Sequence, residues 1–100
     1  VHLELLTGVK PFRTDISDDF VADVINSAKE VYGDDQVILE LNSAGTGPMF
    51  GFGQYLDVPI LGAGTGWVKS GAHAPNENIR IADYYQGVEH IMVLLKEFAS

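Results

Sequence analysis

The sequence has no cysteine, few basic residues and no long apolar run, and each absence excludes a class of protein. Without cysteine the chain can form neither a disulfide framework nor a zinc–thiolate site, and it has no thiol nucleophile. Fourteen acidic residues stand against six basic ones, so the formal net charge of −8 repels phosphate backbones and argues against nucleic-acid binding. The longest apolar runs, such as residues 91–95, are far too short to cross a bilayer.

What is present is typical of a single folded domain. Of the 100 residues, 46% are hydrophobic and 10% are aromatic, which is enough for one core and too much for a disordered tail. The lack of cysteine is compatible with a reducing compartment, and we expect a cytoplasmic location. No signal peptide is visible, and the first residue is valine. Because residues 1–6 look like a strand with no turn or cap before it, we expect a piece of a longer protein.

Three segments have the pattern of strands and three have the pattern of helices. Residues 1–6, 37–41 and 58–64 are predicted strands. Residues 17–32, 48–56 and 81–99 are predicted helices, the first with Ser17 as its N-cap and Gly33 as a left-handed C-cap. The apolar stripes expected to face the core are Phe20, Val24, Ala28 and Val31 in the first helix, and Tyr84, Val88, Ile91, Leu95 and Phe98 in the last. This alternation of strands and helices predicts an α/β fold with at least part of a parallel sheet.

Two glycine-rich turns invite a ligand-binding interpretation. Residues 62–66, GAGTG, follow a predicted strand but do not open into a helix, so they fail the context of a dinucleotide-binding loop. Residues 44–48, AGTGP, stand between a predicted strand and a predicted helix, where free backbone N–H groups and the positive end of the helix dipole would face outward. Gly45, Thr46 and Gly47 would there suit a substrate carboxylate. An ordinary glycine turn with a threonine cap is the alternative, and composition alone favours it.

The loop GAHAPNE, residues 71–77, places a histidine beside a proline, an asparagine and a glutamate. A zinc site needs three or four ligands, and His73 has no companion at a recognisable spacing. His2 lies at the opposite end of the chain. His90 lies off the apolar stripe of the last helix, so we expect its side chain to be solvated. We also expect Asp83 and Glu89 to be surface charges. The residues alone do not predict a complete metal site.

The run from SAGTGPM through VPILGAG to GAHAPNENIRIADYYQG and the closing helix resembles the C-terminal end of M20-family metallopeptidases. These are di-zinc peptidases and deacylases related to carnosinase, acetylornithine deacetylase and succinyl-diaminopimelate desuccinylase. The resemblance implies that His73 is a zinc ligand, in the histidine position of an H-x-x-N-E loop. It implies that Asn76 and Glu77 do not bind the metal but fix this loop and the start of the last helix. The resemblance also places Gly45–Gly47 at the carboxylate or carbonyl end of the substrate.

Two departures from the family pattern qualify what the resemblance implies. Carnosinase-like members carry a glutamate directly before the glycine turn, where this sequence has Ser43 next to Asn42, so an acylated or differently oriented substrate becomes plausible. The H-x-D motif, the bridging aspartate and the adjacent glutamates of the family are absent from this sequence. We therefore expect residues 1–10 to be the last strand of a lid or dimerisation domain. Residues 11–100 would be the C-terminal segment of the catalytic domain.

The resemblance implies an intact enzyme that hydrolyses dipeptides or N-acyl amino acids with two zinc ions, other divalent metals being possible. Its partners would be the N-terminal part of the same enzyme, the substrate, and a second copy in a homodimer. No catalytic residue is assigned within these 100 residues, and we expect the chain alone to be inactive. The alternative is a stand-alone interaction module that keeps the fold without the chemistry.

Overall fold

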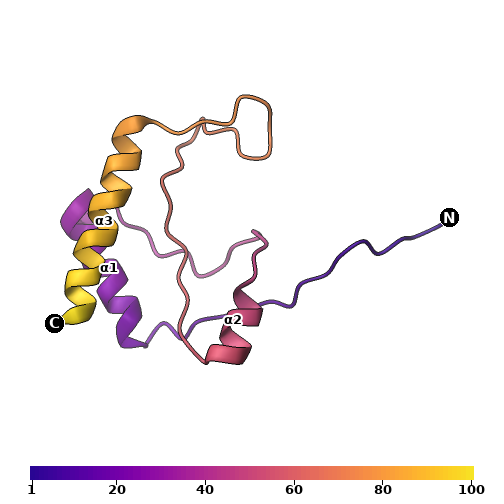
Figure 1. The fold of residues 1–100 in the computed structure, drawn as a ribbon, viewed down its shortest axis with the longest axis horizontal. Coiled ribbons are helices and arrows are strands. Elements are labelled where there is room, and N and C mark those ends of the chain that lie inside the picture. The colour runs from indigo at the N-terminus through magenta and orange to yellow at the C-terminus, as the bar shows by residue number, and fades with distance from the viewer.

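The computed structural model describes residues 1–100 and contains only helical elements, joined by segments without regular secondary structure (Figure 1). In chain order these elements are α1 (Asp19–Tyr32), the 3-10 helix η1 (Asp34–Gln36), α2 (Met49–Leu56) and α3 (Ile81–Ala99). The three α-helices lie within two residues of the predicted ones. None of them combines the length and the apolar character that a bilayer span requires.

The predicted α/β fold is wrong, because no strand and no sheet forms. Segments 1–6 and 37–41 make no ladder of backbone hydrogen bonds, and their apolar side chains face solvent, with Leu3 94% and Ile38 84% exposed. Alternation of apolar and polar residues indicates that a segment could form a half-buried strand. A strand is stabilised, however, by pairing with a neighbouring strand and by burial of one face. Neither condition is met for these segments.

The N-cap of the first helix lies one residue later than predicted. Asp18, not Ser17, is the N-cap: its carboxylate accepts a hydrogen bond from the backbone N–H of Phe20 at 2.9 Å. Ser17 donates instead to Asp15, through its N–H at 2.9 Å and its hydroxyl at 2.8 Å, and these bonds lower the pKa of that carboxyl. At the other end, Gly33 has a φ of 94°, which glycine adopts without a steric penalty.

The core lies between α1 and α3, which pack side by side (Figure 1). It is small: Val21, Val24, Ser27 and Ala28 of α1 and His90 of α3 are the five buried residues. Val24 and Ala28 belong to the predicted apolar stripe of α1, so this part of the prediction is confirmed.

The orientation of α3 differs from the predicted one. Its expected stripe is 44–67% exposed, at Tyr84, Val88, Ile91, Leu95 and Phe98. The less exposed positions of α3 are Asp83, Gly87, His90, Val93, Leu94 and Glu97. The expectation that His90 is solvated is therefore wrong, since its side chain is 4% exposed. Phe98 nevertheless contacts α1, with its ring edge-to-face with Phe20 at 6.0 Å between centroids.

His90 is buried because α1 offers it a hydrogen-bond partner. Its Nε2 lies 3.1 Å from the hydroxyl oxygen of Ser27, which is itself fully buried and donates to the carbonyl of Val24 at 3.0 Å. A hydroxyl has one proton, so when Ser27 donates to Val24, the Nε2–H of His90 is the donor to Ser27. The ring of Tyr32 packs edge-to-face against the imidazole at 5.5 Å. Burial, and then the charges of Asp83 and Glu89, raise the pKa of this tyrosine.

The mutation Ser27→Ala tests this polar contact. It leaves the buried imidazole of His90 without its partner, so we expect the free energy of unfolding to fall by about 1–3 kcal/mol. Urea unfolding followed by far-UV circular dichroism measures the change. The control is Asn26→Ala, the same type of substitution at the preceding exposed helix position. Equal unfolding free energies for the two variants would contradict a stabilising Ser27–His90 bond.

Candidate functional site

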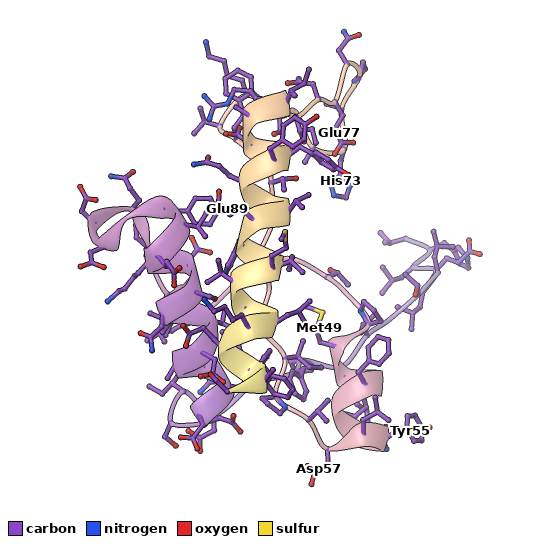
Figure 2. The ribbon with its side chains drawn as sticks, turned by 60° about the vertical axis from the view of Figure 1, so that its left-hand side comes forward. Met49, Tyr55, Asp57, His73, Glu77 and Glu89 are labelled. Carbon is purple, nitrogen blue, oxygen red and sulfur yellow. The ribbon has the colours of Figure 1, made fainter.

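The loop that carries His73 is closed on itself by backbone hydrogen bonds at the N-terminal end of α3 (Figure 2). The hydroxyl of Ser70 accepts a hydrogen bond from the N–H of Trp67 at 2.8 Å, and the N–H of Ser70 donates to the Trp67 carbonyl at 2.9 Å. The N–H of Asn78 donates to the Ser70 carbonyl at 2.9 Å. Residues 70 and 78 therefore form the neck of the loop, and His73 lies near its tip.

The backbone of the tip adopts left-handed conformations at three positions. Gly71, His73 and Asn76 have φ values of 64°, 63° and 64°. For histidine and asparagine such values are uncommon, and they persist where the surrounding structure holds them. The N–H of Ala74 donates to the Gly71 carbonyl at 3.0 Å, which closes a turn around His73. The His73 side chain is exposed and accepts no hydrogen bond from the chain, so its nitrogens are free for a ligand.

The side chain of Asn78 joins the two limbs of this loop. Its Oδ1 accepts a hydrogen bond from the indole Nε1–H of Trp67 at 2.9 Å. Its Nδ2 donates to the carbonyl of Asn76 at 3.0 Å and to that of Lys69 at 3.2 Å. Sequence reasoning missed Asn78, although an asparagine flanked by a glycine-rich loop and a helix start is a typical side-chain-to-backbone partner. The supporting roles inferred for Asn76 and Glu77 stay predictions.

Arg80 connects the loop to the first turn of α3. Its guanidinium makes two hydrogen bonds to the carboxylate of Asp83, from Nε at 2.6 Å and from Nη2 at 2.9 Å. This bond raises the pKa of Arg80. The same group lies 4.9 Å from the ring centroid of Trp67, a cation–π contact. Asp83, expected as a free surface charge, is thus an anchor for the loop.

The chain does not by itself supply a metal site. No group of three or more His, Cys, Asp or Glu side chains is gathered anywhere in it. The imidazole of His73 is accessible and chemically suited to zinc, but a single donor does not hold the ion against water. His90 is not available as a second ligand, because it is buried against Ser27.

The predicted substrate turn lies directly before α2. There the N–H of Gly45 donates to the Ser43 hydroxyl at 3.1 Å, and no side chain caps the N-terminus of α2. Thr46 therefore does not act as the helix cap that the alternative interpretation assumed. Gly53, on α2 itself, faces the ring of Phe12, which leaves no room for a methyl group. This contact explains why residue 53 is a glycine, although glycine inside a helix is destabilising.

An open cavity of about 1020 Å³ adjoins this turn. Gly45, Thr46 and Gly47 line it, together with residues from segments 9–16, 38–43 and 60–62. One side is fixed by Thr14, whose hydroxyl donates to the carbonyl of Ile60 at 2.6 Å and accepts from its N–H at 2.9 Å. His73 does not line the cavity, so the structure does not bring the predicted ligand and the predicted substrate turn together.

Comparison with known proteins identifies a family. The model of Peptidase family M20/M25/M40 matches residues 1–97, nearly the whole chain. Searches among curated proteins and among solved structures gave no match. The inferred resemblance is confirmed at the level of the family, whereas the relation to carnosinase, acetylornithine deacetylase or succinyl-diaminopimelate desuccinylase stays a prediction.

The mutation Thr14→Val tests the wall of the cavity. It removes both hydrogen bonds to Ile60 and leaves the Ile60 N–H unpaired, so we expect its amide hydrogen exchange to become about tenfold faster or more. Exchange measured by NMR reports this residue directly. The control is Thr7→Val, since Thr7 is exposed and makes no such bond. Unchanged exchange at Ile60 would show that the Thr14 pair does not hold the wall.

Proposed function

Since the chain belongs to Peptidase family M20/M25/M40, we propose that it is part of a metal-dependent hydrolase that cleaves dipeptides or N-acyl amino acids. Peptidases of this family are generally metal-dependent. The observation that carries the proposal is the family match over residues 1–97, which includes the loop that presents the exposed His73.

In this proposal His73 supplies one imidazole ligand to a zinc ion, other divalent metals being possible alternatives. The free ring at the tip of a closed loop supports this role. The remaining ligands and the groups that transfer protons belong to residues outside this chain, because its own donors do not complete a site. When bound, two such ions would polarise a scissile carbonyl and activate water. No step of that reaction is assigned to a residue of this chain.

The second contribution would be to substrate binding. Gly45 and Thr46 are exposed in this turn and line the cavity, whereas the side chain of Met49 lies against the half-buried Gly47. These groups suit the carboxylate or carbonyl end of an amino-acid substrate. The N–H of Gly45 is already bonded to Ser43, whereas those of Thr46 and Gly47 make no hydrogen bond within the chain and are the remaining donors of the turn. Domain boundaries at residues 1–10 and 11–100, pairing with the N-terminal part of the enzyme, and a homodimer belong to the same proposal.

One observation favours the alternative of a non-catalytic interaction module. The apolar stripe of α3 is largely exposed to solvent from Tyr84 to Phe98, and an exposed apolar patch is typical of a protein-binding surface. The two proposals differ in one experiment, in which the chain is mixed with the N-terminal part of the hydrolase. Restored hydrolysis supports the enzyme, and binding without hydrolysis supports the module.

The mutation His73→Ala in the intact hydrolase tests metal ligation. We expect it to remove tight binding of one zinc ion per chain, because one of the few ligands is lost, while far-UV circular dichroism stays unchanged. Metal content after dialysis, measured by inductively coupled plasma mass spectrometry, gives the stoichiometry. The control is His2→Ala, which alters an exposed histidine far along the chain. A wild-type zinc content in His73→Ala would refute the assignment.

The mutation Thr46→Val tests the substrate turn. It removes a hydroxyl that would donate to the substrate, so we expect KM to rise about fivefold, equivalent to about 1 kcal/mol. The thermal midpoint should not change, because Thr46 is exposed. Steady-state kinetics of the intact hydrolase on a dipeptide and on an N-acetyl amino acid provide KM, with Thr7→Val as control. An unchanged KM on both substrates would exclude Thr46 from the binding site.

A further inference from the structure

We propose that Asn78 is the positioning residue that fixes the direction in which His73 is presented. This inference rests on the proposed function, in which His73 is a metal ligand. It adds a residue that touches neither metal nor substrate and acts through the loop backbone.

Asn78 binds backbone groups from both limbs of the loop. The carbonyls of Lys69 and Asn76 lie on opposite sides of His73 in the sequence, and one amide group donates to both, at 3.2 and 3.0 Å. The Oδ1 of the same side chain accepts the indole N–H of Trp67 at 2.9 Å. The two Nδ2 protons and one acceptor site of the amide are thus used within the loop. Asn78 therefore connects both limbs and the base of the loop at one point.

The backbone at the tip of the loop is strained. His73 and Asn76 both hold a positive φ, which costs free energy for residues other than glycine. The Asn78 amide binds the carbonyl of Asn76 itself, and the backbone N–H of Asn78 binds Ser70 at the neck. Removing the amide would let the chain relax toward negative φ and would turn the imidazole. A ligand held in its bound direction binds metal more tightly, because less order has to be created on binding.

Contacts of Trp67 and Arg80 connect the loop to the packed helices. The guanidinium carbon of Arg80 lies 4.9 Å from the ring centroid of Trp67, and the guanidinium donates two hydrogen bonds to Asp83 on α3. Since α3 is packed on α1, the clasp formed by Trp67, Asn78 and Arg80 is fixed to the core of the chain. His73 and Glu77 are carried at this end of α3 (Figure 2). The side chain of Gln86, exposed on α3, makes no hydrogen bond within the chain, so it offers a control amide outside this clasp.

The experiment compares Asn78→Ala, Asn78→Asp and the control Gln86→Ala, which removes an exposed amide of α3 that makes no hydrogen bond within the chain. Trp67 is the only tryptophan, so its indole N–H gives a single NMR signal whose hydrogen exchange reports the clasp. In Asn78→Ala we expect this exchange to become about tenfold faster, because the acceptor is lost. Asn78→Asp keeps an acceptor for the indole but removes the donor to Asn76, so indole exchange should stay near wild type. Unchanged exchange in Asn78→Ala would overturn the clasp.

The second readout is the zinc dissociation constant of the intact hydrolase, measured with buffered Zn²⁺. We expect a rise of about 10- to 100-fold in both Asn78 variants, no change in Gln86→Ala, and thermal midpoints of the apo proteins equal to wild type. Wild-type zinc affinity in both Asn78 variants, together with its loss in His73→Ala, would overturn positioning and leave the proposed function intact. Wild-type affinity in His73→Ala as well would overturn the proposed function and, with it, this inference.

Discussion

The arrangement of this chain depends on the packing of α1 against α3, and the contact at its centre is polar. Only five residues are buried, and two of them, Ser27 and His90, are joined by a hydrogen bond across the helix pair. Hydrophobic burial is non-directional, so a small apolar contact would allow α3 to rotate about its axis. A buried imidazole with one partner permits far fewer orientations, because rotation would leave it unsatisfied. This bond therefore fixes which face of α3 is inward, and it leaves the stripe from Tyr84 to Phe98 in solvent.

The orientation of α3 in turn fixes the candidate site. The helix begins at Ile81, directly after the His73 loop, and its first turn holds Asp83. Asp83 binds Arg80, Arg80 covers Trp67, and Trp67 donates to Asn78. These contacts lie on the surface, where a single ion pair contributes little to stability. Their effect is conformational, since together they hold a loop whose backbone is locally strained.

Local signals in the sequence were enough to predict the helices but not their packing. Apolar spacing predicted α1 and α3, the predicted bounds of all three α-helices lie within two residues of the observed ones, and Val24 and Ala28 were predicted on the correct face of α1. The position of His90 was not predictable from its own helix, because the partner that satisfies it, Ser27, lies 63 residues away. The strands failed for a related reason: alternation indicates which faces a segment could bury, whereas pairing depends on a neighbour that local sequence does not reveal. His73 was identified through family resemblance, whereas Asn78 became visible only from its contacts.

The central claim is that the His73 loop of this peptidase-family chain presents a metal ligand. The most direct measurement is a crystal structure of the intact hydrolase with anomalous scattering recorded at the zinc edge. The account predicts an anomalous peak about 2.0–2.1 Å from a ring nitrogen of His73, with the other ligands contributed from outside these 100 residues. Zinc peaks without His73 among their ligands, with its imidazole in solvent, would contradict the account.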